Sequence, residues 1–319
     1  MTTSYRQINY SLRPRKSIER KMIGEVLQRL RHIEKLEEYR YIGFGSIYFS
    51  DFSLFHRNLN ITKMISIEKD GKNKERFEFN APFRCIELKI GESVHVLPKL
   101  KWHERTILWL DYDGSLDYNI FTDIETFVSQ ARSGSVIIIS CNIEPLKEDP
   151  TTKTRLPVLK KILKEKTPLE TREVDLTRAN FGKYVRNVLH NYIISLVTQR
   201  NGPEKNSLNY EYKQLFNFQY SDNATMLTIG GLLINHEEDK IKDKLDDCDF
   251  QSLSFVRTGE ENYEIDAPNL TSREISWINS FMPCDDISII TDKKCIPEKD
   301  IQNYIKHYRF YPQFVEIEI

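Results

Sequence analysis

Five stretches of glycine or polar residues follow five apolar segments in the first half of this sequence, and their residue types suit a bound nucleoside. In chain order they are Gly43-Phe44-Gly45-Ser46, Glu68, Gly91-Glu92-Ser93, Asp111-Tyr112-Asp113-Gly114 and Ser140-Cys141-Asn142. Glycines let a ligand approach the backbone and the start of a following helix. An acid about 20 residues after a glycine turn is where a carboxylate accepts hydrogen bonds from a ribose diol. Five such endings in order are typical of a nucleoside-containing ligand.

Several residues in and near these stretches also have an ordinary structural interpretation; Asp113, for example, could merely cap the following turn. Gly43 and Gly45 could form only a tight turn, and Glu68 could be a surface acid. Cys141 is most simply a small buried hydrophobe, and His56 is expected to be a satisfied helix histidine. The third glycine of the dinucleotide fingerprint is absent, which disfavours a nicotinamide-dependent dehydrogenase.

The elements that must position these stretches alternate between strands and helices. Near-continuous apolar strands separated by helices indicate a parallel sheet covered on both faces, and therefore a Rossmann-like, doubly wound α/β fold. The carboxyl ends of parallel strands meet at one edge, so the five stretches are expected to share one site. Strands are expected at 39–42, 63–68, 83–91, 106–114 and 134–142, and helices at 46–59, 73–80 and 121–131.

The second half of the sequence adds helices and one antiparallel pair of strands. Helical patterns cover 157–166, 185–199, a stretch that begins at a Thr271 cap, and 297–308. Two apolar runs around Ser221-Asp222-Asn223, within 215–235, predict a terminal antiparallel hairpin. Residues 237–249 hold seven acids and three lysines and indicate a solvated linker or helix. The expected division is an N-terminal segment 1–38, a sheet domain 39–235 and a small α/β appendage 236–319.

The predicted first helix, 17–36, is basic on its outer face. Residues 1–33 contain eight Lys or Arg against two Glu. We interpret this as a solvated face, with contact to phosphate or nucleic acid as a possible but less favoured alternative. The clustered cations are Arg13, Arg15, Lys16, Arg20 and Lys21.

Composition narrows the class of protein. The 319 residues are 39% hydrophobic and 29% charged, with a net charge of -1, so nothing global indicates nucleic acid or a membrane. The five cysteines are scattered, which is typical of reduced thiols. No signal peptide pattern is present, and the longest apolar run is far too short to cross a bilayer. The expected location is cytoplasmic.

The order of strand endings resembles that of the class I S-adenosylmethionine-dependent methyltransferases over residues 39–235. The stretches YSLRPRKSIERKM, YIGFGSIYFSDF, MISIE and LDYDG are similar to a group of bacterial proteins that carry the family name putative O-methyltransferase. The resemblance implies S-adenosylmethionine as cofactor and methyl transfer to an oxygen nucleophile of an unidentified substrate.

The resemblance also implies roles for individual residues. Asp111 would border the amino group and the transferred methyl group. Apart from the resemblance, an oxygen nucleophile needs a base nearby, and Asp113 or Asp111 is the expected one. Cofactor contacts would come from Gly43, Gly45 and Ser46 (methionine part), Glu68 (ribose), Gly91, Glu92 and Ser93 (adenine neighbourhood) and Asp111 with Tyr112. From their places beside the strand endings, and not from the resemblance, Tyr48, Tyr118 and Asn142 are the expected substrate contacts, although Tyr48 could instead pack in the core.

Two departures from related patterns matter. Metal-dependent small O-methyltransferases carry Asp-x-x-Lys after the fourth strand and Asp-Asn after the fifth, whereas Gly114 and Cys141-Asn142 stand here, so no metal is expected. The motif of nucleobase amine methylation is also absent. The alternative function is a catalytically weak or inactive module that binds S-adenosylmethionine or another nucleotide and acts through a partner protein. Its C-terminal segment, which ends in HYRFYPQFVEIEI, would dock that partner.

Overall fold

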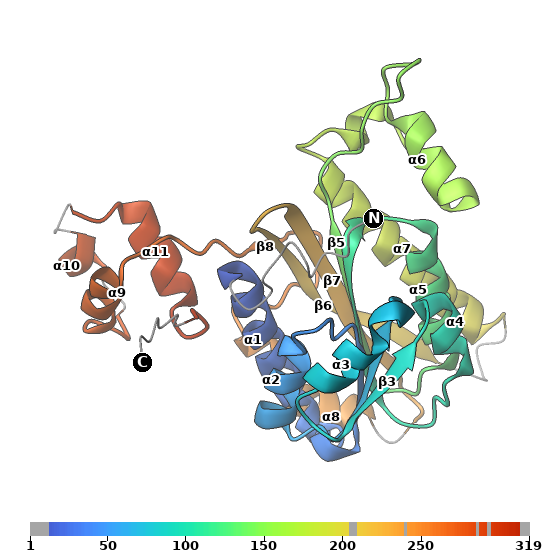
Figure 1. Ribbon diagram of the computed structural model, residues 1–319, viewed down its shortest axis with the longest axis horizontal. Helices are drawn as coiled ribbons and strands as arrows, with labels where there is room; N and C mark the ends of the chain where they lie inside the picture. Colours follow the sequence, from blue (N-terminus) through green and yellow to red (C-terminus); the bar gives the residue numbers. More distant parts are fainter. Residues whose placement is uncertain (1–12, 204–208, 239–240, 285–286, 292–294, 313–319) are drawn as a thin grey trace.

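The computed structural model describes residues 13–203, 209–238, 241–284, 287–291 and 295–312, and its centre is one eight-stranded sheet (Figure 1). The strand order is β3-β2-β1-β4-β5-β7-β6-β8. In that order the strands are Ile86–Ile90, Lys63–Glu68, Arg40–Gly43, Thr106–Ser115, Ser135–Asn142, Thr225–Asn235, Tyr210–Ser221 and Tyr263–Glu264.

Strands β1 to β5 pair in parallel, and β7 then runs antiparallel to both β5 and β6. This confirms the expected Rossmann-like, mostly parallel sheet with a terminal antiparallel hairpin. The strand order reverses at β1, which lies between β2 and β4. Open α/β sheets bind ligands at such a switch point, beyond the carboxyl ends of the strands.

Helices cover both faces of the sheet and bury two apolar clusters. Helices α1 (Pro14–Arg29), α2 (Ser50–Leu59) and α8 (Ile241–Asp247) cover one face. Helices α4 (Ser93–Val96), α5 (Tyr118–Gln130) and α7 (Phe181–Asn201) cover the other, as Figure 1 shows. The other helices are α3 (Lys74–Asn80), α6 (Leu156–Leu163), α9 (Ser272–Asn279), α10 (Ser288–Thr291) and α11 (Glu298–His307).

Several predicted helices have different bounds in the structure; the one expected over 185–199, for example, is Phe181–Asn201. The helix expected from residue 46 begins at Ser50, because Ser46 (φ 54°) and Phe49 (φ 46°) have left-handed backbones that no α-helix accepts. The helix expected over 17–36 ends at Arg29 and continues as a short 3-10 turn. The acidic segment 237–249 is not simply solvated, since Ile241 and Cys248 are fully buried.

Helix α1 is a core element, and the expectation of a solvated basic face is wrong for two of its cations. Its apolar side packs against α2 and the sheet through residues such as Ile18 and Met22. Lys16 is fully buried and Arg20 is only 9% exposed. The expectation assumed that every lysine and arginine of the helix faces solvent. Lys16 and Arg20 instead face the sheet, together with the apolar residues.

The C-terminal segment contributes β8 to the sheet edge and then forms three helices with a small apolar core of their own. Figure 1 shows α9, α10 and α11 grouped beside α1 and β8. Polar contacts join the two parts: Arg15 pairs with Asp266 at 2.7 Å, and Lys21 donates to the Phe310 carbonyl at 3.0 Å. The start of the N-terminal segment (1–12) and the end of the aromatic tail (313–319) lie outside the described residues.

A membrane-spanning helix would need a long apolar stretch, and no helix within the described ranges has one.

Candidate functional site

In the turn after β1, neighbouring side chains leave no room for a side chain at Gly43 or Gly45. A Cβ atom on Gly43 would lie 2.6 Å from the Tyr41 hydroxyl oxygen. One on Gly45 would lie 2.5 Å from the ring of Phe49. Both distances are shorter than real Cβ contacts, so larger residues would displace the turn. The glycines therefore hold the chain close to β2, where the backbone NH groups face the next strand ending.

Glu68, at the end of β2, is fixed across this turn. Its Oε1 accepts hydrogen bonds from the Ser46 backbone NH at 2.7 Å and from Ser66 Oγ at 2.9 Å. Ser66 Oγ also accepts the Gly45 NH at 3.1 Å. Burial raises the pKa of Glu68 to about 7, and these hydrogen bonds oppose the rise. Ser66 was not a predicted site residue. Its position could have indicated the contact, because residues two apart on a strand point to the same face and Ser66 lies two residues before Glu68.

Asp111, where β4 passes from buried to partly exposed, forms an ion pair that the sequence did not predict. Lys16 Nζ of α1 lies 2.7 Å from Asp111 Oδ1 and 2.7 Å from Glu19 Oε2. The same ammonium sits 4.7 Å from the centre of the Trp109 ring, a favourable cation–π distance. A buried lysine held by two carboxylates brings α1 directly into the candidate site.

Glu19 connects this ion pair to the next two strands. Its Oε1 accepts a short hydrogen bond from Thr228 on β7, and Thr228 Oγ1 lies 2.6 Å from Ser140 Oγ on β5. Ser140 Oγ also accepts from Trp109 Nε1 at 3.0 Å. All of these side chains are buried, so the network fixes α1 against the sheet.

Asp123, inside α5, joins two predicted cofactor residues. Ser93 Oγ and the Tyr112 hydroxyl each donate to Asp123 Oδ2 at 2.5 Å. Asp123 is fully buried, and burial raises its pKa to about 6. The sequence pattern placed Asp123 on a helix but carried no signal for this role, because its two partners lie on other elements.

The other predicted contacts are more dispersed. Glu92 and Asp113 are exposed, and Gly91 has a φ of 148° that suits glycine at this corner. The Tyr118 hydroxyl donates to Glu165 at 2.6 Å, outside the Asp111 network. The exposed Gly114 has open space around its Cβ position.

Two further predicted substrate residues take local structural partners. Tyr48 packs beside Phe77 in a small separate cluster. Asn142 Oδ1 accepts the Glu144 backbone NH at 2.7 Å. The structure thus places several of the predicted cofactor residues around Glu68, Asp111 and Asp123, whereas Tyr48, Tyr118 and Asn142 do not form one cluster.

Two side chains with possible chemistry have ordinary environments. Cys141 is fully buried, and burial raises the pKa of its thiol to about 12, which confirms that it behaves as a small hydrophobe. His56 Nδ1 lies 2.9 Å from the Ile61 carbonyl oxygen. Within the ranges that the structure describes, no group of three or more His, Cys, Asp or Glu could hold a metal ion.

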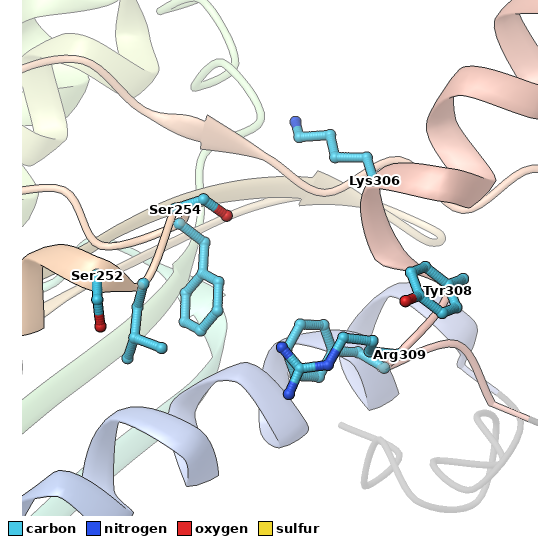
Figure 2. Close-up of a pocket in the computed structure, with 8 residues that line it drawn as sticks. Ser252, Ser254, Lys306, Tyr308 and Arg309 are labelled. Atoms are coloured by element: carbon cyan, nitrogen blue, oxygen red, sulfur yellow. The ribbon is translucent and has the colours of Figure 1, made fainter. Parts of the chain in front are cut away.

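Two cavities lie away from these strand endings. One has a volume of about 140 Å³. Figure 2 shows its lining residues, with Ser252 and Ser254 on one side and Lys306, Tyr308 and Arg309 on the other. The second, of about 490 Å³, opens near the amino ends of β1 and β2 and is lined by Arg40 and Lys63 among others. None of the predicted site residues lines either cavity.

Several buried polar atoms around the strand endings have no hydrogen-bond partner among the described residues. They are Ser46 Oγ beside Glu68, Asp123 Oδ1 behind Ser93, Arg20 Nε on α1 and the Tyr220 hydroxyl at the end of β6. Buried polar groups are normally satisfied, so such a set needs a partner. A ligand that joins a free amino acid to a nucleoside would offer hydrogen-bond partners for such atoms.

Comparison with known proteins finds remote similarity to several solved structures. Structurally similar chains include Trm1 from Pyrococcus horikoshii in complex with S-adenosyl-L-methionine, at 9% identity and a TM-score of 0.47 over 72% of this chain and 57% of that chain. An O-methyltransferase from Bacillus cereus in complex with SAH gives 14% identity and a TM-score of 0.33 over 66% of this chain and 80% of its own.

The chain thus spans only 57% of the length of the archaeal protein. No curated protein matches the sequence. A family model described as "Putative O-methyltransferase" matches residues 8–319, nearly the whole chain. The chain belongs to that family.

Proposed function

We propose that this protein transfers the methyl group of S-adenosylmethionine to an oxygen nucleophile. The observation that carries the proposal is the pair of strand endings on either side of β1. Glu68 ends β2 with its carboxylate fixed by Ser46 and Ser66, and Asp111 lies on β4 with its carboxylate held by Lys16. The two carboxylates flank the switch point where open α/β sheets bind ligands.

Each carboxylate has a distinct role in this proposal. Glu68 accepts hydrogen bonds from the ribose hydroxyls, and Asp111 orients the amine of the methionine part. Gly43, Gly45 and Ser46 let that part approach the backbone. Adenine lies near Gly91 and Glu92. Ser93 and Tyr112, which share Asp123, line the same region.

The bound sulfonium supplies an electrophilic methyl group without a metal, so the protein mainly aligns the acceptor and excludes water. An oxygen acceptor also needs a base nearby. Asp111 already holds the Lys16 ammonium, which leaves the exposed Asp113 as the candidate base. Asn142, Tyr48 and Tyr118 remain candidates for substrate contact.

The test is transfer of a labelled methyl group. The purified protein is incubated with methyl-labelled S-adenosylmethionine and cell extract, and nucleic acid, protein and small molecules are then separated. Label in a product that releases methanol in mild alkali indicates a carboxyl ester, and alkali-stable label released only by ether cleavage indicates a methylated hydroxyl. Label found only on nitrogen would contradict the proposal.

The second candidate is a module that binds the cofactor and acts through a partner protein. Gly114 stands where metal-dependent enzymes carry lysine, which favours this reading, and helices α9 to α11 offer a separate docking element. Tight binding of S-adenosylhomocysteine, with no transfer into any fraction, would favour this candidate over the enzyme.

A further inference from the structure

Arg20 is a buried cation with a guanidinium nitrogen that is unpaired within the described part of the chain. It is 9% exposed, and its Nε has no hydrogen-bond partner among the described residues. An arginine presents five N–H donors, and a buried one is normally paired with a carboxylate or another acceptor. The Arg20 guanidinium can therefore still donate a hydrogen bond to an anion.

Arg20 lies one helical turn after Lys16, on the side of α1 that faces the sheet. Residues four apart share one face of a helix, and Lys16 Nζ is 2.7 Å from Asp111. Arg20 also lies near Asp51, in the first turn of α2, which accepts a short hydrogen bond from the Tyr41 hydroxyl. Burial raises the pKa of the Asp51 carboxyl, and the nearby Arg20 charge opposes that rise.

Tyr220, near the end of β6, supplies a second unused donor in the same neighbourhood. Its hydroxyl is buried without a hydrogen-bond partner among the residues described, and Lys16 Nζ lies 5.7 Å from the centre of its ring. Burial raises the pKa of this hydroxyl well above its usual value, so it keeps its proton and can donate. The charges of Asp111 and Arg20 both act on the Tyr220 hydroxyl, so these two donors and the Asp111 carboxylate lie in one neighbourhood.

This arrangement has the chemistry of a site for an α-amino acid zwitterion. The carboxylate of such a ligand accepts hydrogen bonds from a guanidinium and a hydroxyl, and its ammonium donates to a carboxylate. We propose that Arg20 and Tyr220 bind the carboxylate of the methionine part of the cofactor, while Asp111 binds its amine. The inference rests on the proposed function, because it assigns one end of the same cofactor site.

The test measures binding and needs no methyl acceptor. Isothermal titration compares S-adenosylhomocysteine, its decarboxylated analogue S-adenosyl-3-thiopropylamine, and 5′-methylthioadenosine, which lacks both the carboxylate and the amine. The parent protein should prefer S-adenosylhomocysteine over the decarboxylated analogue by about 10- to 100-fold, the range expected for charge-assisted hydrogen bonds. Arg20→Gln should remove most of this preference and Tyr220→Phe part of it. Both variants should bind 5′-methylthioadenosine within about twofold of the parent.

Arg29→Gln is the matched control, because Arg29 lies on the same helix but contacts Ser252 and Asp249. It should leave all three affinities unchanged. An equal loss of all three ligands in Arg20→Gln would make Arg20 a structural residue and overturn the inference. An unchanged preference for the carboxylate in that variant would do the same. If the parent protein bound none of the ligands, the cofactor assignment would fail, and this inference with it.

Discussion

The Nζ atom of Lys16, in the first turns of α1, lies 2.7 Å from Oδ1 of Asp111, although the two residues are 95 positions apart in the chain. Glu19, one turn further along the helix, holds the same ammonium at 2.7 Å. The pair joins the N-terminal helix to the strand ending where we propose that methyl transfer occurs. It makes α1 part of the site instead of a separate basic arm.

Lys16→Met should destabilise the protein strongly. Removing the cation leaves Glu19 fully buried and Asp111 partly buried without their partner, and breaking a buried pair from one side costs about 3–5 kcal/mol. Chemical denaturation measures the change in the free energy of unfolding. Lys63→Met is the control: Lys63 pairs with Glu38 at 3.0 Å but is 40% exposed, and such surface pairs contribute at most about 1 kcal/mol. Equal effects of the two substitutions would contradict the central role of Lys16.

The affinity for S-adenosylhomocysteine should depend on pH through Glu68. In the free protein its pKa is raised to about 7, and the ionised carboxylate is the better acceptor for the ribose hydroxyls. Affinity should therefore rise about tenfold between pH 6 and pH 8 as the carboxylate loses its proton. Glu68→Gln, measured by titration calorimetry, should bind more weakly and with little pH dependence across that range. A parent protein whose affinity stays flat over these two pH units would remove Glu68 from the ribose contact.

Much of the fold was readable because its signals are local. The apolar runs of β4 and β5 predicted buried parallel strands, and the two runs around Asp222 predicted the hairpin. The spacing between the glycine turn and Glu68 placed both at one edge of the sheet, where a hydrogen bond now joins them.

The unpredicted parts depend on contacts between distant elements. Lys16 and Arg20 have the residue types of a solvated helix face, and only the packing of α1 on the sheet shows that they are buried. Asp123 lies within a regular helix, and its role comes from Ser93 and Tyr112 on other elements. β8 has only two residues, too few for a periodic pattern.

Asp113→Ala should abolish methyl transfer and leave cofactor binding nearly intact. Asp113 is exposed and lies two residues beyond Asp111, so it can face an acceptor without touching the cofactor. Loss of a general base reduces turnover by about 10²- to 10⁴-fold. The measurement pairs transfer rates on an identified acceptor with titration of S-adenosylhomocysteine. Asp247→Ala, an exposed acid on α8, should change neither quantity. A parallel loss of binding and turnover would place Asp113 in the cofactor site, and unchanged turnover would exclude it as the base.

Asp123 should make the stability of the protein depend on pH between about 4 and 6. Burial raises its folded-state pKa to about 6, above the ordinary value of 3.8. The folded state therefore holds this proton more tightly than the unfolded chain, so the contribution is present below the ordinary pKa and is lost as pH rises through 6. Relative to Asp123→Asn, the parent should lose on the order of 3 kcal/mol of unfolding free energy over that interval.

Denaturant-induced unfolding of both proteins at several pH values gives this difference. The protonation of all other groups affects both proteins equally and cancels. The side-chain carbonyl of asparagine can still accept from Ser93 or Tyr112, so this variant isolates the charge. Asp123→Ala also removes the acceptor and should cost a further 1–3 kcal/mol or so at every pH, because two buried hydroxyls then lack a partner. Parallel pH curves for the parent and Asp123→Asn would show that Asp123 titrates normally in the folded protein. Burial would then not raise the pKa of the Asp123 carboxyl in the folded protein.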